Sequence, residues 1–529
     1  MNNKNHSRLP PWLAVSTITL VVLVGVLLTT GMLQSAAAHA LQLSISNTEV
    51  TPVTERRAET TSTNYPNCRF GVGGAVSGYD VASLNVGWHL DFGTQLSPNR
   101  PNGAEYIQVI DLKPALNGYA FTPPTSTLYQ IMDQNHGSTW LIGNEPDGPL
   151  VDNLYPETYA RAYHDLYYLI KQYDPTARVG IAAIIQPTPL RFQYLDRVWN
   201  AYQQYYGEPL STDLWNTHSY ILREIDPSDP EAYPNGPYMV WGAYIPPGIS
   251  ATRGILYNES DMFSLSIFQQ RLLDLRRWMA DHGERDKSLY ITEYGELFPY
   301  PPYMPNGDPE PYVDENGVPI TEARVAAFMT GTFNLLQSAS DPGVGYPADG
   351  NRLVQRWLWF STNYRGYGGM LFDPDSRQRS QLGNAFYTYT HAISSGVDLL
   401  AVRVTADPPV FYDDGQPHTT TLKALISNVG NISVNVPFTV SFYAGQPESG
   451  TIIGSHSVTS ALSGCAATLD ITQTWPGLSS GANDIYVQVD TDNQVSEANE
   501  DNNIAPGVVL VTNQRAYLPI VLRGSAFLP

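Results

Sequence analysis

Cysteine is nearly absent from this chain of 529 residues, which contains only Cys68 and Cys465. Two thiols cannot build a cysteine-based metal site. They fall in parts of the chain that we assign below to different domains, so we do not expect them to form a disulfide with each other. The fold must then be stabilised by its core rather than by cross-links.

Charged residues are also scarce, at 15% of the chain, and basic residues are the scarcer kind. Lys and Arg number 29 against 50 Asp and Glu, which gives a formal charge of -21. This balance disfavours nucleic acid and anionic membranes as partners. It leaves neutral and cationic ligands open.

One apolar run, at residues 12–33, is long enough to span a bilayer. Lys4 and Arg8 precede it, and an Ala-x-Ala sequence at 38–40 follows it, as in an export signal. We predict cleavage directly after this sequence, and an uncleaved membrane anchor is the alternative. In either case we expect the bulk of the chain to be extracellular or exposed at the cell surface.

Short apolar runs alternate with stretches of helical spacing through the first three quarters of the chain. Eight runs are candidate strands: 69–76, 85–90, 105–111, 139–143, 178–185, 213–220, 288–293 and 356–361. Helices are predicted at 156–173, 264–281 and 321–338. Such alternation predicts a parallel α/β sheet, and eight strands are the number that closes a (β/α)8 TIM barrel. The weak helical pattern after the second run allows a distorted barrel.

After Gly396 the helical spacing disappears and short alternating runs separated by turn residues replace it, at 399–404, 420–426, 438–443 and 484–489. This pattern predicts a small all-β immunoglobulin-like sandwich. The predicted domains are a signal peptide or anchor at 1–40, a Thr/Ser-rich linker at 41–67, the barrel at 68–395, the sandwich at 397–512 and a tail at 513–529. The tail contains an apolar run that is either a last edge strand or a sorting signal.

The sequence TWLIGNEPDGP, at 139–149, follows an apolar run with an amide and a carboxylate, Asn144 and Glu145. A plain turn is the alternative, because Asn, Pro, Asp and Gly all favour turns. A second carboxylate, Glu293, ends the seventh candidate strand. The C-terminal ends of barrel strands share one face, so these two glutamates can meet across it. Paired carboxylates are what the cleavage of a glycosidic bond needs.

The order of these motifs resembles the retaining glycoside hydrolases of clan A. The matching residues are Asn144-Glu145 on the fourth candidate strand, His218 and Tyr220 on the sixth, Glu293 on the seventh and Trp359 on the eighth. The resemblance covers about residues 68–395. It implies that Glu145 is a general acid/base that keeps its proton near neutral pH, and that Glu293 stays ionised and acts as the nucleophile.

The resemblance also implies substrate-binding residues. Asn144 would bind the sugar hydroxyl beside the reacting carbon, and Tyr220 would donate a hydrogen bond to Glu293. His218 would orient one glutamate, although a lone histidine at a strand end is more often structural. The aromatic candidates for the cleft are Trp359, Trp88 and Tyr294, and core packing is the alternative for both tryptophans. No metal or cofactor is expected.

The end of the sandwich carries a second resemblance. The sequence VQVDTDNQVSEANEDNN at 487–503, with NVGN at 428–431 before it, is similar to CARDB domains of bacterial extracellular proteins. This implies an association with the cell surface or envelope. The acidic residues include Asp490 and Glu497 and suggest calcium, but their spacing is not that of a calcium-binding loop, so we favour a solvated acidic hairpin.

These patterns predict an exported retaining glycoside hydrolase that acts on a polysaccharide or oligosaccharide. The long Pro- and Tyr-rich stretches at 226–249 and 298–318 would wall an open groove, which favours endo-type cleavage of a neutral chain. The alternative is a catalytically silent carbohydrate-binding or adhesion protein on a barrel scaffold. The distance between the two carboxyl groups separates retention, at about 5–5.5 Å, from inversion, at about 6.5–9.5 Å.

Overall fold

A computed structural model describes residues 67–226, 242–304, 307 and 309–513. The predicted export segment, nearly all of the linker and the C-terminal tail after residue 513 lie outside these residues, and so does the middle of the 226–249 stretch. Among the described helices, none combines the length and the apolar character needed to cross a membrane.

A closed barrel of parallel strands forms the first part of the described chain. Its eight positions are β1 (Phe70–Gly73), β2 (Trp88–Leu90), β3 with β4 (Glu105–Tyr106 and Gln108–Ala115), β6 (Thr139–Ile142), β7 (Arg178–Ile181), β8 (Leu214–His218), β11 (Ser288–Glu293) and β12 (Arg356–Phe360). Only Ile107 separates β3, which pairs with β2, from β4, which pairs with β6. Because β1 also pairs with β12, the sheet closes on itself. The TIM-barrel prediction is confirmed.

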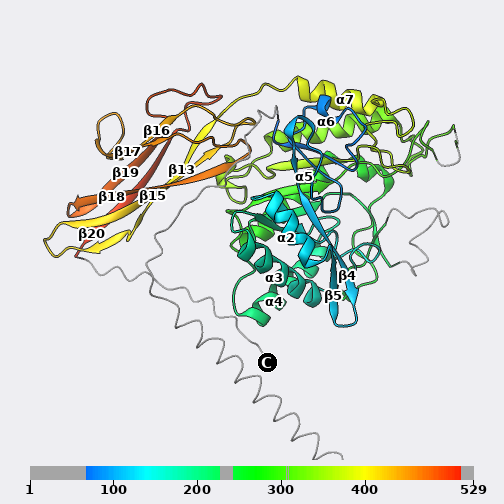
Figure 1. Cartoon of the computed structure of the whole chain (residues 1–529), viewed down its shortest axis with the longest axis horizontal. Helices are drawn as coiled ribbons and strands as arrows, with labels where there is room; N and C mark the ends of the chain where they lie inside the picture. The colour runs from blue at the N-terminus through cyan, green and yellow to red at the C-terminus, as the bar shows by residue number, and fades with distance from the viewer. Residues whose placement is uncertain (1–66, 227–241, 305–306, 308, 514–529) are drawn as a thin grey trace, which may run out of the picture. The chain divides into compact units, whose positions relative to one another are not determined.

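The helices cover the barrel unevenly (Figure 1). In the described residues they are α2 (Thr125–Gln134), α3 (Pro156–Tyr173), α4 (Pro189–Tyr206), α5 (Leu265–Asp281), α6 (Glu322–Ser338) and α7 (Gln381–His391). Three of them match the predicted stretches, and the first two strands are followed only by the short turns η2 (Val81–Leu84) and η3 (Pro101–Gly103). An antiparallel strand, β5 (Gly118–Thr122), extends β4 as a hairpin that the sequence pattern did not indicate.

Alternation along the strands decides which side chains face the barrel interior. The interior is packed by Trp88, Leu90, Ile107, Val109, Leu141, Leu214, Tyr290 and Leu358. On β12, Leu358 points inward, whereas Trp357 and Trp359 join the larger core between the strands and the helices. The strand ends beyond this packed interior are the places where polar side chains can reach the cleft.

The second part of the described chain is a β-sandwich, as predicted. One sheet contains β13 (Leu399–Asp407), β15 (His418–Asn428) and β18 (Ala467–Leu478). The other contains β14 (Val410–Tyr412), β20 (Ile504–Thr512), β19 (Gly481–Val489), β16 (Phe438–Ala444) and β17 (Thr451–Val458). Their inner faces enclose a separate core that includes Phe442, Ile485 and Val487. All four predicted runs lie within these strands.

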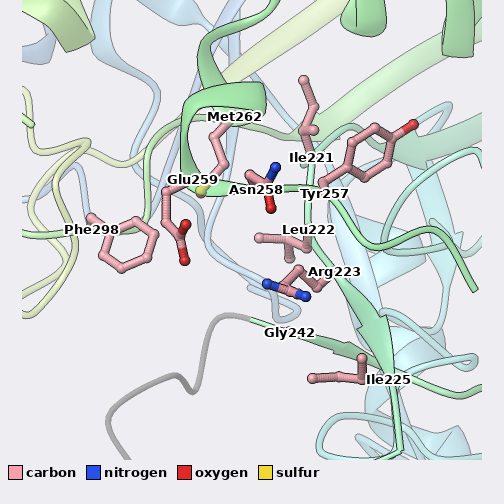
Figure 2. A pocket seen from close by; sticks show the side chains of 10 residues that line it. All are labelled: Ile221, Leu222, Arg223, Ile225, Gly242, Tyr257, Asn258, Glu259, Met262 and Phe298. Atoms are coloured by element: carbon pink, nitrogen blue, oxygen red, sulfur yellow. The ribbon is translucent and has the colours of Figure 1, made fainter. Parts of the chain in front are cut away.

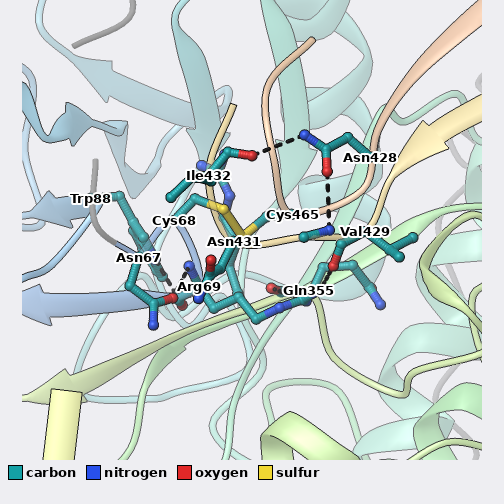
Figure 3. The surroundings of a disulfide bond; sticks show 12 residues. Asn67, Cys68, Arg69, Trp88, Gln355, Asn428, Val429, Asn431, Ile432 and Cys465 are labelled. Atoms are coloured by element: carbon teal, nitrogen blue, oxygen red, sulfur yellow. Dashed lines mark hydrogen bonds between the residues drawn. A yellow bond between two sulfur atoms is a disulfide. The ribbon is translucent and has the colours of Figure 1, made fainter. Parts of the chain in front are cut away.

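The two cysteines form a disulfide, with their Cα atoms 5.9 Å apart. Our expectation of two unlinked thiols is wrong, because turns of the sandwich are hydrogen-bonded to the start of the barrel. The amide of Cys68 donates to the carbonyl of Asn431 at 3.3 Å, and within the sandwich the amide of Cys465 donates to the carbonyl of the neighbouring Gly430 at 2.8 Å. Figure 3 shows this joint. Tertiary contacts thus bring together residues that are 397 positions apart.

A buried ion pair lies beside the disulfide. Arg69 donates two hydrogen bonds of 2.8 Å to the carboxylate of Asp349 and one of 2.9 Å to the carbonyl of Val429 in the sandwich. Charge-assisted bidentate pairs of this kind are among the stronger hydrogen-bonded contacts in proteins. Because Cys68 and Arg69 precede β1, the joint lies at the N-terminal ends of the barrel strands.

We expect Cys68→Ser and Cys465→Ser each to lower the free energy of unfolding by about 2–4 kcal/mol, because either change removes the cross-link from the unfolded chain. The midpoint of thermal unfolding measures the effect. Dithiothreitol should bring the wild type down to the midpoint of the variants and leave the variants unchanged. Variants as stable as the oxidised wild type would contradict this expectation.

Candidate active site

Three polar side chains meet at the C-terminal ends of the barrel strands. Glu145 follows β6, His218 ends β8 and Glu293 ends β11. One ligand atom from each of them lies within 4.8 Å of the others, so oxygens of the two carboxylates are no farther apart than that. This bound agrees with the separation of about 5–5.5 Å between the carboxyl groups of retaining glycosidases.

Each glutamate has a fixed hydrogen-bond partner. Nδ1 of His218 lies 2.6 Å from Oε1 of Glu145 and 3.7 Å from Oε2 of Glu293. The hydroxyl of Tyr220 donates to Oε1 of Glu293 at 2.7 Å. His218 is fully buried, while the side chains of Glu145 and Glu293 are 12% and 15% exposed. The two carboxylates therefore keep a small exposed part, whereas His218 behind them has none.

The charges in this site are strongly interdependent. Burial raises the pKa of Glu293 to about 7, and the neighbouring Glu145 adds to this, whereas His218 and the hydrogen bond from Tyr220 lower it. Burial lowers the pKa of His218, but the two glutamates outweigh burial and leave this pKa above its usual value. The sequence led us to expect that Glu293 stays ionised throughout. Its raised pKa means instead that it loses its charge near neutral pH, because burial penalises the charged form.

Glu145 occupies an unusual backbone conformation. Its φ of 52° lies in the left-handed region, which residues other than glycine seldom adopt. Asn144, which precedes it, is partly exposed, and its backbone amide donates to Oδ2 of Asp152 at 2.7 Å. The backbone amide of Gly148 donates to the carbonyl of Glu145 at 2.9 Å. Gly143 is needed here, since its φ is 94° and a Cβ atom would lie 2.7 Å from Asp152.

Three predicted substrate-binding residues lie outside the cleft. Trp88, Tyr294 and Trp359 are each fully buried. Trp88 packs inside the barrel, and Trp359 and Tyr294 pack edge to face at 5.3 Å on the helix side of the strands. The prediction that they bind sugar is corrected, because Trp88 is covered inside the barrel and the other two face the helices.

A different aromatic group lies at the end of β12, and the sequence analysis missed it. Phe360 packs against Phe92, Tyr364 and Tyr367, with ring centroids 5.9, 5.6 and 5.7 Å away. Burial raises the pKa of Tyr367, and the charges of both glutamates add to this, so its hydroxyl lies near them. Tyr364 is 55% exposed and can offer a ring face to a sugar. The Tyr- and Gly-rich sequence NYRGYGG directly after the strand was the available signal.

A small hollow of about 20 Å³ opens between the loops that follow β8 and β11 (Figure 2). Tyr257, Met262 and Phe298 form apolar parts of its wall. The charged ends of Arg223 and Glu259 turn toward the same space, and Nε of Arg223 is buried without a hydrogen-bond partner among the described residues. The lining of the hollow begins directly after Tyr220, whose hydroxyl is hydrogen-bonded to Glu293.

Among the described residues, Glu145, His218 and Glu293 are also the group whose donor atoms could surround a metal ion. Nδ1 of His218 and Oε1 of each glutamate already take part in hydrogen bonds, whereas Nε2 of His218 is buried without a hydrogen-bond partner among the described residues. In the sandwich, Asp490 accepts hydrogen bonds from the backbone of the hairpin, and Glu497 accepts one from the amide of Leu399. Asp490 is only 4% exposed, so this part of the predicted solvated hairpin is buried and stabilises the hairpin through its hydrogen bonds.

Comparison with protein families matches residues 410–506 to CARDB. No curated protein matches the chain. The CARDB domain of a Pyrococcus furiosus protein, described in complex with di-metal ions, is 24% identical and covers 23% of this chain and 100% of its own, with a TM-score of 0.20.

The barrel has similar solved structures of its own. A GH128 (subgroup II) endo-β-1,3-glucanase from Pseudomonas viridiflava is 15% identical over 60% of this chain and 97% of its own, with a TM-score of 0.39. A GH128 (subgroup I) endo-β-1,3-glucanase from Amycolatopsis mediterranei, in complex with laminaritriose, is 17% identical over 61% and 99%, with a TM-score of 0.38. The chain thus joins a TIM barrel that resembles those of GH128 β-1,3-glucanases to a C-terminal CARDB domain.

Proposed function

We propose that the protein is an exported retaining glycoside hydrolase that cleaves a neutral polysaccharide within the chain. The observation that carries the proposal is the pair of carboxylates within 4.8 Å of each other at the ends of β6 and β11. His218 and Tyr220 support the pair from behind, so both carboxylates face the cleft. The solved relatives make β-1,3-glucan the first substrate to test.

The reaction takes place in two displacements. A carboxylate oxygen of Glu293 attacks the anomeric carbon while the glycosidic C–O bond breaks, and Glu145 gives its proton to the leaving oxygen. Water then attacks the same carbon and loses a proton to Glu145, and the bond to Glu293 breaks. The sum is hydrolysis with retention, and both glutamates return to their starting states.

The surroundings of the pair support binding of an extended neutral chain. Tyr364 offers an exposed aromatic face at the end of β12. Arg223 and Glu259 turn a donor and an acceptor into the hollow beside Tyr220, and together they suit the hydroxyls of a sugar without adding net charge. We include endo-type cleavage in the proposal because the long Pro- and Tyr-rich stretches predict an open groove.

Export is part of the proposal. The N-terminal apolar run with its Ala-x-Ala sequence is typical of an export signal. Disulfides persist mainly in oxidising compartments, so the bond between Cys68 and Cys465 supports a location outside the cytoplasm. We also propose that the CARDB domain associates the protein with the cell surface or envelope.

The competing function is a silent carbohydrate-binding or adhesion protein, which the CARDB domain favours. Incubation with β-1,3-glucans, mixed β-glucans, mannans, xylans and galactans, followed by reducing-sugar detection, decides between the two. We expect turnover of at least one neutral polymer and a mixture of oligosaccharide products. Binding without turnover on the whole panel would favour the silent protein, and release of single sugars alone would overturn the endo assignment.

Two variants assign the roles of the glutamates. Glu293→Ala should abolish turnover of every substrate, because no glycosyl-enzyme can form. Glu145→Ala should lower turnover of the natural linkage by about 10²–10⁴-fold, but it should still form the intermediate from a dinitrophenyl glycoside and show a burst. Azide, which needs no general base, should then restore turnover of the Glu145 variant and give a β-glycosyl azide from a β-linked substrate.

The control for these variants is Glu157→Gln, an exposed carboxylate outside the site, which should leave all rates unchanged. If both variants are equally inactive on the dinitrophenyl glycoside, the roles are not those proposed. If azide restores the Glu293 variant with an inverted product, the two roles must be exchanged.

The pH profile provides a further test. Because the pKa of Glu293 is raised to about 7, its nucleophilic form is lost as pH falls through this value. We expect kcat/KM to fall about tenfold per pH unit below pH 6, with an acidic midpoint near pH 7. A profile that stays flat from pH 5 to pH 7 would contradict this expectation and place the nucleophile at the usual pKa of a glutamate.

A further inference from the structure

A buried charge network lies beneath the loop that carries Glu145. Asp147, Arg191 and Glu224 are each fully buried. Arg191 lies in the first turn of α4, and one of its nitrogens pairs with Oδ2 of Asp147. Its Nε lies 3.3 Å from Glu224 in β9 (Glu224–Ile225), and its Nη2 donates at 2.8 Å to the carbonyl of Tyr244 in β10 (Ala243–Tyr244). One side chain thus connects the loops that follow β6, β7 and β8.

Such a network is a costly way to stabilise a fold. Burying charges carries a large desolvation penalty, and apolar packing of the same volume is often at least as stable. Asp147 lies within the turn that the hydrogen bond from the amide of Gly148 to the carbonyl of Glu145 closes, and its side chain is buried. Its full burial, two residues after Glu145, indicates a structural task that is specific to this loop.

That task is visible in the hydrogen bonds on both sides of Pro146. Before it, the amide of Glu145 donates to the carbonyl of Ala183 at 3.1 Å. After it, the carboxylate of Asp147 accepts from the amide of Ile185 at 3.3 Å and from Arg191. The loop is therefore tied to the segment after β7 at two points, and Glu145 lies at the first of them with its φ of 52°.

We propose that Asp147 and Arg191 are positioning residues, whose buried ion pair holds Glu145 in its left-handed backbone conformation and so directs its carboxyl group toward His218 and the cleft. Glu224 holds Arg191 from its other side. The catalytic part of this inference rests on the proposed function, whereas the conformational part does not. It assigns a role to the Asp147 of the Asn-Glu-Pro-Asp sequence.

The first test exploits leaving groups. Asp147→Asn removes the negative charge that pairs with Arg191 and replaces one accepting oxygen by an NH2 donor, so the tie is weakened with little change of volume. We expect kcat on an oligosaccharide to fall about 10²-fold, because a general acid displaced by about 1 Å protonates the leaving oxygen poorly. On a dinitrophenyl glycoside, which scarcely needs the acid, the loss should stay below about fivefold. Arg191→Lys keeps the positive charge but loses the planar guanidinium group and its several N–H donors, so it should show the same pattern.

The chain offers a matched control. Arg197, on the same helix α4 as Arg191, forms an ion pair with Glu157 of α3, and the two side chains are 41% and 38% exposed. Exposed pairs of this kind contribute little to stability. Glu157→Gln should therefore leave kcat and KM unchanged on both substrates. Equal losses on both substrates in the Asp147 and Arg191 variants, or no loss on either, would overturn the proposal.

The second test does not depend on activity. Amide hydrogen exchange should become faster at Glu145 and Gly148 in folded Asp147→Asn and Arg191→Lys, while amides in the middle of α3 keep their wild-type rates. Unchanged exchange at Glu145 and Gly148 would overturn the proposal. A wild type that cleaves no glycoside would overturn the proposed function alone, because the exchange result would still decide the role of the ion pair.

Discussion

Two carboxyl groups within 4.8 Å of each other repel when both are charged, and the rest of the site is arranged around this repulsion. His218 lies against both glutamates, and Tyr220 binds one of them. Burial, to which the repulsion adds, raises the pKa of Glu293 to about 7. A pair in this state can supply a proton and a negative oxygen in the same reaction, which is the requirement for acid-assisted nucleophilic attack.

The two glutamates differ in how the fold holds them. Glu293 is the last residue of β11 and is paired with His218 in the parallel register of β8, so the sheet itself fixes its backbone. Glu145 lies beyond the end of β6, in a backbone conformation that few residues other than glycine adopt, and it depends on its loop. This difference explains why a buried ion pair lies beneath Glu145, where it links the loops after three neighbouring strands.

The contacts that join the CARDB domain to the barrel lie at the opposite ends of the strands. The disulfide and the pair of Arg69 with Asp349 precede or flank the start of β1, whereas the glutamates follow strand ends. The joint and the catalytic face therefore use different ends of the same barrel. The described contacts of the CARDB domain place no demand on the residues around Glu145 and Glu293.

The sequence by itself determined the eight strands, the three most regular helices, the sandwich and the two strand-end glutamates, because apolar periodicity and a carboxylate after an apolar run are local signals. Only the tertiary structure decided the disulfide between Cys68 and Cys465, the burial of Trp88, Tyr294 and Trp359, and the pairing of Asp147 with Arg191. The face on which an aromatic residue lies depends on a one-residue register, which an all-apolar strand does not reveal. Partners far apart in the chain are likewise invisible until the barrel closes and brings its strand ends together.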